Sequence, residues 1–189
     1  GSQHHRLRRL VTKTFTRGRV EHLRPRIEQI VNELLDELPQ YAAADGSVDL
    51  RPHYAYPVPM RVICELVGVP EEWRPQLRTL VDSIFRTDTT PEEVTETQRA
   101  RHELLNNLVD LRRREPGEDL TSALIAANHA DPEALTDEEL IDTIWLFVTA
   151  GHETTLSLLL NGVRNLLTHP DQLEIDRKST RLNSSHTQK

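Results

Sequence analysis

The residues best suited to chemistry form one short run, Ala150 to Thr155, inside an apolar stretch. Gly151 costs about 1 kcal/mol of helix stability relative to alanine. A buried Glu153 needs a hydrogen-bond partner or a water, and Thr154 can bond back to carbonyls of the preceding turn. Together they predict a polar notch in an apolar helix. Such a notch can hold a small polar molecule, with Glu153 relaying protons and Thr154 holding a water or an oxygen species.

A purely structural interpretation of the same run stays open at this point. Gly151 would let another helix approach closely, and Thr154 would bond inside its own helix. The spacing favours neither interpretation. A zinc-protease site is excluded, because the pattern H-E-x-x-H begins at His152 but position 156 is Leu156, not histidine.

The notch requires a long helix to carry it. Thr136 and Glu139 have the spacing of a capping box, and His169-Pro170 predicts the end of the helix. The resulting helix has about 33 residues and a length of about 50 Å. Its middle, residues 144–148, is apolar on all sides, which is typical of a helix through the centre of a domain.

Helical periodicity continues through most of the remaining chain. The composition agrees, with 37% hydrophobic residues, 28% charged residues and 7 glycines. We therefore predict a mainly α fold, a helical bundle around the long central helix, with at most one short strand near 48–50. Six other helices are predicted. The first covers 7–15. The second has its core stripe over 27–38, Pro25 in its first turn and Pro39 at its end. The third is set up by prolines at 52, 57 and 59 and stopped by Gly68, and the rest cover 71–85, 91–114 behind a Thr90–Glu93 capping box, and 120–128.

The formal charge of −7 hides a basic first segment. Residues 1–26 contain eight arginines and lysines and a single glutamate, a local charge of +7. This segment indicates either an anionic partner or a solvated helix face. The lone Cys64 excludes a disulfide framework and suits a reducing cytoplasm. We expect neither a signal peptide nor a membrane span, because Asp142, His152 and Glu153 interrupt the most apolar window.

Several runs occur in an order that matches one enzyme family. One of them is A-G-H-E-T-T in the long helix, which is followed by N-G-V-R-N-L-L-T-H-P-D-Q-L. Another is H-H-R-L-R-R-L-V, which begins at His4. Between these two lie R-P-R-I-E-Q-I-V-N-E-L-L-D and V-I-C-E-L-V-G-V-P. The chain thus resembles the bacterial-type cytochromes P-450 from residue 4 to about 174. This is less than half of a whole member of that family.

The resemblance implies a haem-dependent monooxygenase with b-type haem as its cofactor. His4 and Arg8 match the pair that binds the haem propionates, and their i, i+4 spacing puts both on one helix face. Ala150 and Gly151 match positions that let the central helix lie against the haem and leave room for oxygen. A solvated basic face is the alternative for His4 and Arg8.

The resemblance also implies catalytic and substrate-facing positions. Glu153 and Thr154 match the acid and the alcohol that deliver protons to dioxygen. Trp145, Leu146 and Thr149, one to two turns before the notch, are expected to face the substrate. Residues 85–91 correspond to a loop that opens and closes over it.

The chain departs from the family pattern where the iron would be held. The family's ligand is a cysteine thiolate in a loop of the type F-G-x-G-x-x-x-C-x-G, and this sequence contains no such loop. Cys64 stands in a helical context without glycines and is predicted to be a core residue, so we assign no metal ligand. The family's E-x-x-R pair is also absent. We therefore expect residues 1–175 to form a partial catalytic domain that is inactive by itself and marginally stable.

The tail differs in character from the rest. From residue 176 the sequence D-R-K-S-T-R-L-N-S-S-H is polar and unpatterned, and it resembles the conceptual translation of a common sequencing adapter. We expect residues 176–189 to be a sequence artefact and disordered.

The parent enzyme is expected to insert one oxygen atom from dioxygen into a small, mostly apolar molecule. Electrons would come from a ferredoxin or a flavin reductase, and we expect a cytoplasmic monomer that binds no nucleic acid and no membrane. The alternative from another class is a helical regulator that binds nucleic acid through residues 4–26. The basic charge supports it, but no helix-turn-helix spacing is found there and the notch stays unexplained.

Overall fold

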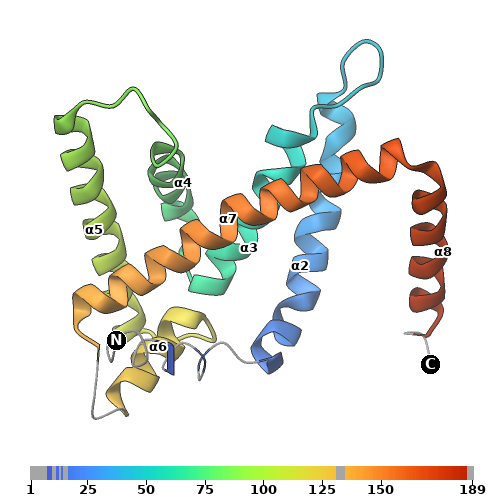
Figure 1. Ribbon diagram of the computed structural model, residues 1–189. Coiled ribbons are helices and arrows are strands. Elements are labelled where there is room, and N and C mark those ends of the chain that lie inside the picture. The colour runs from blue at the N-terminus through green and yellow to red at the C-terminus, as the bar shows by residue number, and fades with distance from the viewer. Residues whose placement is uncertain (1–7, 10–11, 13, 15–16, 131–134, 187–189) are drawn as a thin grey trace.

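The computed structural model describes residues 8–9, 12, 14, 17–130 and 135–186. The described chain is helical (Figure 1). Its elements are α2 (Arg17–Glu37), η1 (Leu38–Tyr41), η2 (Arg51–Ala55), α3 (Pro57–Val67), η3 (Glu71–Trp73), α4 (Arg74–Ser83), α5 (Pro91–Arg114), α6 (Leu120–His129), α7 (Asp137–Thr168) and α8 (Pro170–His186). A mainly α partial fold is thereby confirmed.

The strand allowed near 48–50 does not form. Residues 47–49 have no regular structure, and no strand occurs elsewhere among the described residues. A strand needs a second strand for its backbone groups. Here the nearby backbone groups bond locally instead, since Ala43 donates to the carbonyl of Ser47 at 2.8 Å and Arg51 donates to Asp49 Oδ1 at 2.9 Å.

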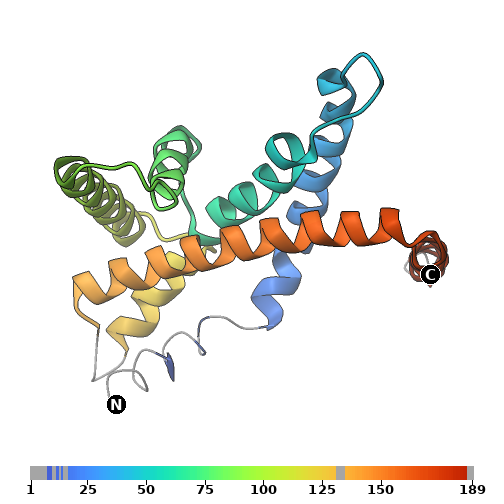
Figure 2. The same ribbon diagram turned by 45° about the horizontal axis from the view of Figure 1, so that its top comes forward.

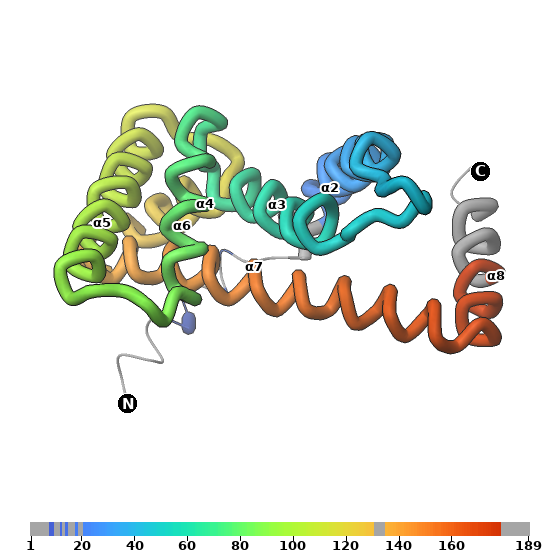
Figure 3. Tube along the Cα trace, turned by 90° about the horizontal axis from the view of Figure 1, so that it is seen from above, coloured from blue at the N-terminus to red at the C-terminus, as the bar shows by residue number. Residues whose placement is uncertain are grey.

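Helix α7 is the axis of the molecule, as predicted. Its first turn is closed by a capping box, in which the Glu139 amide donates to Thr136 Oγ1 at 3.2 Å and the Thr136 amide donates to the Glu139 carboxylate at 2.9 Å. The helix has 32 residues and ends at Thr168, with His169 as its C-cap. Turned to the view of Figure 2, it passes across the whole body. Seen from above in Figure 3, helices α2 to α5 all lie along one side of α7.

One apolar core joins α3, α4, α5, α6 and α7. It is built mainly from leucine, isoleucine and valine, as the scarcity of aromatic residues predicts. The residues with at most 1% exposure are Cys64, Val67, Leu77, Val81, Leu105, Leu108, Leu120, Leu140, Ile141, Ile144 and Val148. A smaller cluster of Ile30, Leu34 and Val58 fixes α2 against α3. Burial of these stripes, rather than helix propensity, holds the helices together.

Helix α2 begins earlier than predicted. We expected Pro25 in the first turn of this helix, but α2 begins at Arg17 and contains Pro25 in its interior. Proline removes one backbone hydrogen bond and is costly inside a helix. Charge pairs along α2 offset part of that cost: Arg24 pairs with Glu21 at 3.4 Å, and Arg26 donates to Glu65 of α3 at 2.8 Å.

The α3–α4 junction is held by glycine and charge. Gly68 ends α3 with φ +75°, a left-handed conformation that favours glycine, and a Cβ there would meet the Asp119 side chain at 2.5 Å. Glu65 accepts from both Arg26 and Arg74. Burial acts to raise the pKa of Glu65, but the two guanidinium groups outweigh it, so the pKa lies below its ordinary value.

Residues 176–186 of the tail are helical, whereas the sequence analysis expected disorder there. Helix α8 continues to His186, and Lys178 pairs with Glu174 one turn before it at 2.8 Å. It stands at the far end of α7, apart from the main body (Figure 3). The division of the chain near residue 176 and the origin of the tail stay predictions. Within the described part of the chain, no helix is long and apolar enough to cross a membrane.

Candidate functional site

The run Ala150 to Thr155 lies at the middle of α7 and presents different residues to two faces. Ala150 and Thr154 are exposed, whereas His152 is buried. Thr154 donates its hydroxyl to the Ala150 carbonyl at 2.6 Å. This bond back to the preceding turn was part of both interpretations of the sequence.

Gly151 lies on the packed face. A Cβ at this position would meet Cδ1 of Ile63 at 2.9 Å, so the glycine allows α3 to approach α7 closely. The interface interpretation therefore holds for Gly151. Its predicted contact with haem stays a prediction, and the structure gives this residue a packing role of its own.

His152 is the most unusual residue of the packed face. It is 1% exposed, and neither ring nitrogen has a hydrogen-bond partner of normal geometry among the described residues. Its ring meets Tyr56 edge to face, with 4.6 Å between the ring centroids. Burial lowers the pKa of His152, while the Tyr56 backbone and the Glu153 carboxylate act weakly in the other direction. The imidazole is therefore neutral near pH 7.

The opposite face of α7 is uncovered. Leu146 is 64% exposed and Leu158 is 71% exposed, although both are leucines in the central helix of the fold. With Ala150 and Thr154 they form a stripe of residues spaced four apart, which we call the open face. Apolar side chains exposed on a central helix mark a surface that another group covers.

Glu153 lies beside the open face and is half-buried. Its carboxylate makes no ion pair or hydrogen bond with any described residue, so it keeps its full capacity to accept hydrogen bonds. Glu153 and Thr154 are thus adjacent at the edge of an uncovered apolar surface, and their roles as acid and alcohol stay predictions.

The three predicted substrate-facing residues do not lie together. Leu146 belongs to the open face. Trp145 packs against the core and lies under the Arg101 guanidinium of α5, 5.6 Å from its ring centroid. Thr149 is partly buried and donates its hydroxyl to the Trp145 carbonyl at 3.0 Å. Whether any of them contacts a substrate stays a prediction.

The two predicted propionate ligands are only partly described. His4 lies outside the described residues, and Arg8 is exposed. Cys64 is 1% exposed in the core, as predicted, and burial raises the pKa of its thiol to about 11. Such a thiol is unsuited to hold a metal.

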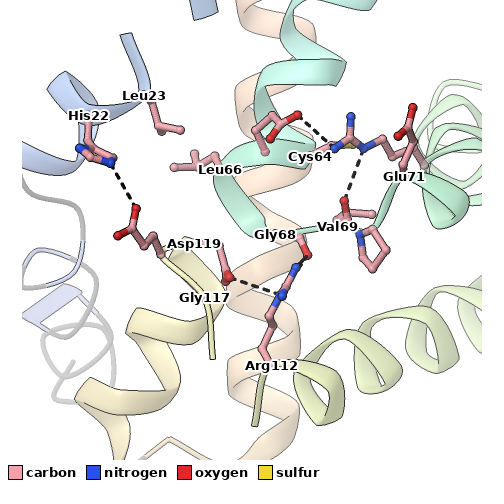
Figure 4. A pocket seen from close by; sticks show the side chains of 14 residues that line it. His22, Leu23, Cys64, Leu66, Gly68, Val69, Glu71, Arg112, Gly117 and Asp119 are labelled. Carbon is pink, nitrogen blue, oxygen red and sulfur yellow. Dashed lines mark hydrogen bonds and ion pairs between the residues drawn. The ribbon is translucent and has the colours of Figure 1, made fainter. Parts of the chain in front are cut away.

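Several pockets lie away from the open face. One, of about 430 Å³, lies between α2, α3 and α6 (Figure 4). Several of its charged groups are paired. Arg112 donates to the Gly68 carbonyl at 2.6 Å and contacts Asp119 at 3.2 Å, and His22 contacts Glu118 at 3.2 Å. Another, of about 290 Å³, lies between α4 and α5 and has Trp145 in its wall.

Sequence reasoning missed two features of this region. The buried His152 with its Tyr56 partner was treated only as the first letter of an excluded zinc pattern, and Arg101 was treated as one charge of an amphipathic helix. No spacing signal could have found either one. Tyr56 lies far from His152 in the sequence, and only the tertiary contact of α3 with α7 brings them together.

The open face fits a haem group. Its centre is the small side chain of Ala150, with Leu146 one turn before and Thr154 one turn after, so a flat apolar ring can approach the helix closely. The Thr154 hydroxyl and the Glu153 carboxylate lie at the edge of that surface. A helical core, a central helix, and an acid and an alcohol beside an uncovered apolar face agree with the class of haem proteins that the sequence resembles.

The comparisons with known proteins identify the family. The cytochrome P450 family model matches residues 74–176, more than half of the chain. The chain is 44% identical over 174 residues to cytochrome P450 monooxygenase PikC of Streptomyces venezuelae, covering 90% of this chain and 40% of that protein. It is 41% identical to the vitamin D(3) 25-hydroxylase of Pseudonocardia autotrophica, covering 96% and 44%. The solved structure of CYP154C4 from Streptomyces sp. W2061 matches with a TM-score of 0.81 at 46% identity, covering 92% and 42%.

The chain belongs to the cytochrome P450 family. It spans about two fifths of the length of these curated relatives. The family's cofactor is b-type haem. The comparisons give no support to the alternative of a nucleic-acid-binding regulator.

Proposed function

We propose that this chain forms the oxygen-activating face of a haem-dependent monooxygenase that inserts one atom of dioxygen into a mostly apolar organic molecule. The observation that carries the proposal is the open face of α7, with the acid of Glu153 and the alcohol of Thr154 at its edge. When bound, the haem supplies the chemistry that activates dioxygen. The other oxygen atom leaves as water, which requires electrons and protons from outside.

The residues of this chain would handle protons and position the cofactor. Glu153 has an unpaired carboxylate and can take a proton from solvent and release it at the open face. Thr154 can turn its hydroxyl from the Ala150 carbonyl toward a water or an oxygen species. Ala150 permits the close approach of the haem, and Gly151 contributes by fixing α7 against α3. His4 and Arg8 would pair with the propionates.

The substrate and the partners follow from the relatives by analogy. The names of these relatives include a vitamin D(3) hydroxylase and a 6-deoxyerythronolide B hydroxylase, which act on apolar molecules. We propose a substrate of that apolar character, with Leu146 and Thr149 beside it and residues 85–91 as a movable loop. A ferredoxin or flavin reductase would dock near the basic segment 1–26. The enzyme would be a cytoplasmic monomer.

A chimera tests this function. Residues 4–174 would replace the equivalent segment of the Streptomyces CYP154C4 enzyme, which is 46% identical to this chain and of which this chain covers 42%. The chimera is expected to bind haem, to give the ferrous–CO absorption band of a thiolate-ligated haem, and to oxidise an apolar substrate. Thr154→Ala should raise the release of hydrogen peroxide relative to product, and Glu153→Gln should slow turnover by about 10²-fold or more.

The matched controls lie away from the open face. Thr95→Ala removes an exposed hydroxyl that bonds only within α5, and Glu96→Gln removes an exposed carboxylate paired with Arg99. Both should leave turnover and peroxide release unchanged. A chimera that folds with full helical content but takes up no haem would contradict the proposal.

A further inference from the structure

We infer that Tyr56 and Asp82 form an exit for oxidising equivalents that find no substrate: Tyr56 gives an electron to the haem and its phenol proton to the Asp82 carboxylate. The inference rests on the proposed function, because the oxidant is the haem once dioxygen or a peracid has oxidised it. The pair lies beside the packed face of α7, and the proton handling assigned to Glu153 and Thr154 does not use it.

The pair joins the start of α3 to the end of α4. Tyr56 is the residue before α3, and Asp82 lies in the last turn of α4. The Tyr56 hydroxyl donates to Oδ1 of Asp82, and the other carboxylate oxygen faces Arg78 Nε at 3.8 Å. A base within hydrogen-bond reach can take the proton as the electron leaves. Tyr56 can therefore lose both together.

Tyr56 differs in this respect from the other two tyrosines of the chain. Tyr41 is 43% exposed and stacks on His53, with 3.8 Å between the ring centroids. Tyr54 packs against the small apolar cluster between α2 and α3. Among the described residues, no carboxylate accepts a hydrogen bond from either hydroxyl, so only Tyr56 has a proton acceptor in place.

The charges around Tyr56 favour a neutral radical as the product. Burial and the hydrogen bond to Asp82 raise the pKa of Tyr56 far above its ordinary value, so the phenol keeps its proton near pH 7 and oxidation must release it. The Arg78 guanidinium lies over the ring, 4.7 Å from its centroid. A cation there opposes positive charge on the ring. Transfer of the proton to Asp82 removes that charge.

The path from Tyr56 to the open face is short. His152 is 1% exposed, and its ring meets Tyr56 edge to face at 4.6 Å between the centroids. His152 is two residues from both Ala150 and Thr154, which places it across the helix from the open face, since each residue turns the helix by about 100°. One ring contact and the width of one helix, about 10 Å, therefore separate Tyr56 from the surface proposed to receive the haem.

The electrons and protons of this step balance. The O–H bond of Tyr56 breaks, its electron reduces the oxidised haem by one equivalent, and its proton forms an O–H bond on Asp82. A soluble reductant such as a thiol or ascorbate then returns one electron to Tyr56, and the proton comes back from Asp82. No oxygen atom is transferred.

Trp145 is the competing oxidisable ring, because it lies in α7 itself. The Arg101 guanidinium lies over its ring, 5.6 Å from the centroid, and opposes positive charge there as Arg78 does at Tyr56. Trp145 lacks the compensating feature, since no carboxylate among the described residues accepts from its indole N–H. Tyr56 is therefore the expected site of the radical.

The test uses the CYP154C4 chimera, loaded with haem, free of substrate and mixed with peracetic acid. Rapid freezing followed by electron paramagnetic resonance should show a tyrosyl radical. Tyr56→Phe should lose most of this signal. The matched control is Tyr54→Phe, two residues away and without a carboxylate partner, and it should keep the signal.

A second pair of variants tests the proton acceptor. Asp82→Asn should also lose most of the signal, because an amide of the same size cannot take the phenol proton. Asp88→Asn, at an exposed site paired with Arg86, should keep it. Haem absorbance should bleach faster under peracetic acid in Tyr56→Phe and Asp82→Asn than in the two controls. Circular dichroism and the ferrous–CO band verify that all four variants fold and hold haem.

The outcomes separate this inference from the proposed function. A tyrosyl signal that persists in Tyr56→Phe, or a tryptophan radical that disappears in Trp145→Phe, would overturn the inference. A chimera with full haem content and no protein radical would overturn it too and leave the proposed function standing. A chimera that takes up no haem would contradict the function, and the inference would fall with it.

Discussion

The two faces of α7 carry similar residues and have opposite surroundings. On the packed face, Leu156 is 1% exposed and Gly151 lies against Ile63. On the open face, Leu158 is 71% exposed and Ala150 lies against no other helix. Side-chain type does not distinguish the faces, since both contain leucine, a small residue and threonine. Tertiary packing distinguishes them, and the face that this chain leaves open is the one beside the acid and the alcohol.

Truncating the two leucines gives the largest expected contrast. Leu156→Ala should lower the free energy of unfolding by about 3 kcal/mol, because it leaves a cavity in the packed face. Leu158→Ala should change it by less than about 0.5 kcal/mol. Urea denaturation followed by circular dichroism measures both. Similar losses in the two variants would mean that the open face is covered in solution.

Enlarging the two small residues sharpens the same contrast. Gly151→Val should destabilise the chain by about 2 kcal/mol, because the new side chain collides with Ile63. The gain in helix propensity, a few tenths of a kcal/mol, does not offset this. Ala150→Val should lower the free energy of unfolding by only about 0.6 kcal/mol, the difference in helix propensity between the two residues. The account fails on this point if urea denaturation ranks the two variants in the reverse order.

Hydroxyl groups offer a third comparison. Thr121 in α6 is fully buried and donates its hydroxyl to the Val67 carbonyl at 2.7 Å. Thr121→Val leaves this buried carbonyl without its donor and should lower the free energy of unfolding by about 1.5 kcal/mol. Thr154 bonds only to a carbonyl of its own helix, and Thr154→Val should cost less than about 0.5 kcal/mol. Thermal unfolding of both variants checks this. A large loss for Thr154→Val would give that hydroxyl a structural role instead of the proposed one.

The pH dependence of stability tests the buried imidazole. Burial lowers the pKa of His152 in the folded chain, so the unfolded chain binds the proton more readily near pH 6. The contribution of His152 to the free energy of unfolding is therefore fully present above the ordinary histidine pKa of about 6.5, and it falls as the pH decreases below that value. His152→Phe should flatten this part of the profile, whereas His102→Gln, at an exposed site, should not. If the slope of the free energy of unfolding against pH is unchanged in His152→Phe, His152 is not the source of the pH dependence.

The sequence predicted the helical elements well where local signals fix them. Thr90 and Thr136 form the capping boxes that their spacing indicated, and Gly68 ends α3 as predicted. The predicted start of α2 was wrong, because it relied on Pro25 as a local signal, and tertiary contacts and ion pairs override that signal. The short strand that the sequence allowed near 48–50 does not form, because a strand needs a partner strand that no local pattern supplies.

The candidate site was predicted in its residues but not in its geometry. The run Ala150 to Thr155 follows from spacing and from family resemblance. Which of its residues face inward depends on the contact of α3 with α7, which no local pattern encodes. Arg101 over Trp145 and Tyr56 against His152 are contacts of the same kind.

The most direct test of the central claim is the haem content of the CYP154C4 chimera that carries Ala150→Trp. If the open face receives the haem, an indole at its centre occupies the same space, and haem content measured by absorbance should fall to a small fraction of that of the unsubstituted chimera, with helical content unchanged. Leu167→Trp, at a 68% exposed site farther along α7, should keep full haem content. Full haem content in the Ala150→Trp chimera would show that the open face is not where the haem lies.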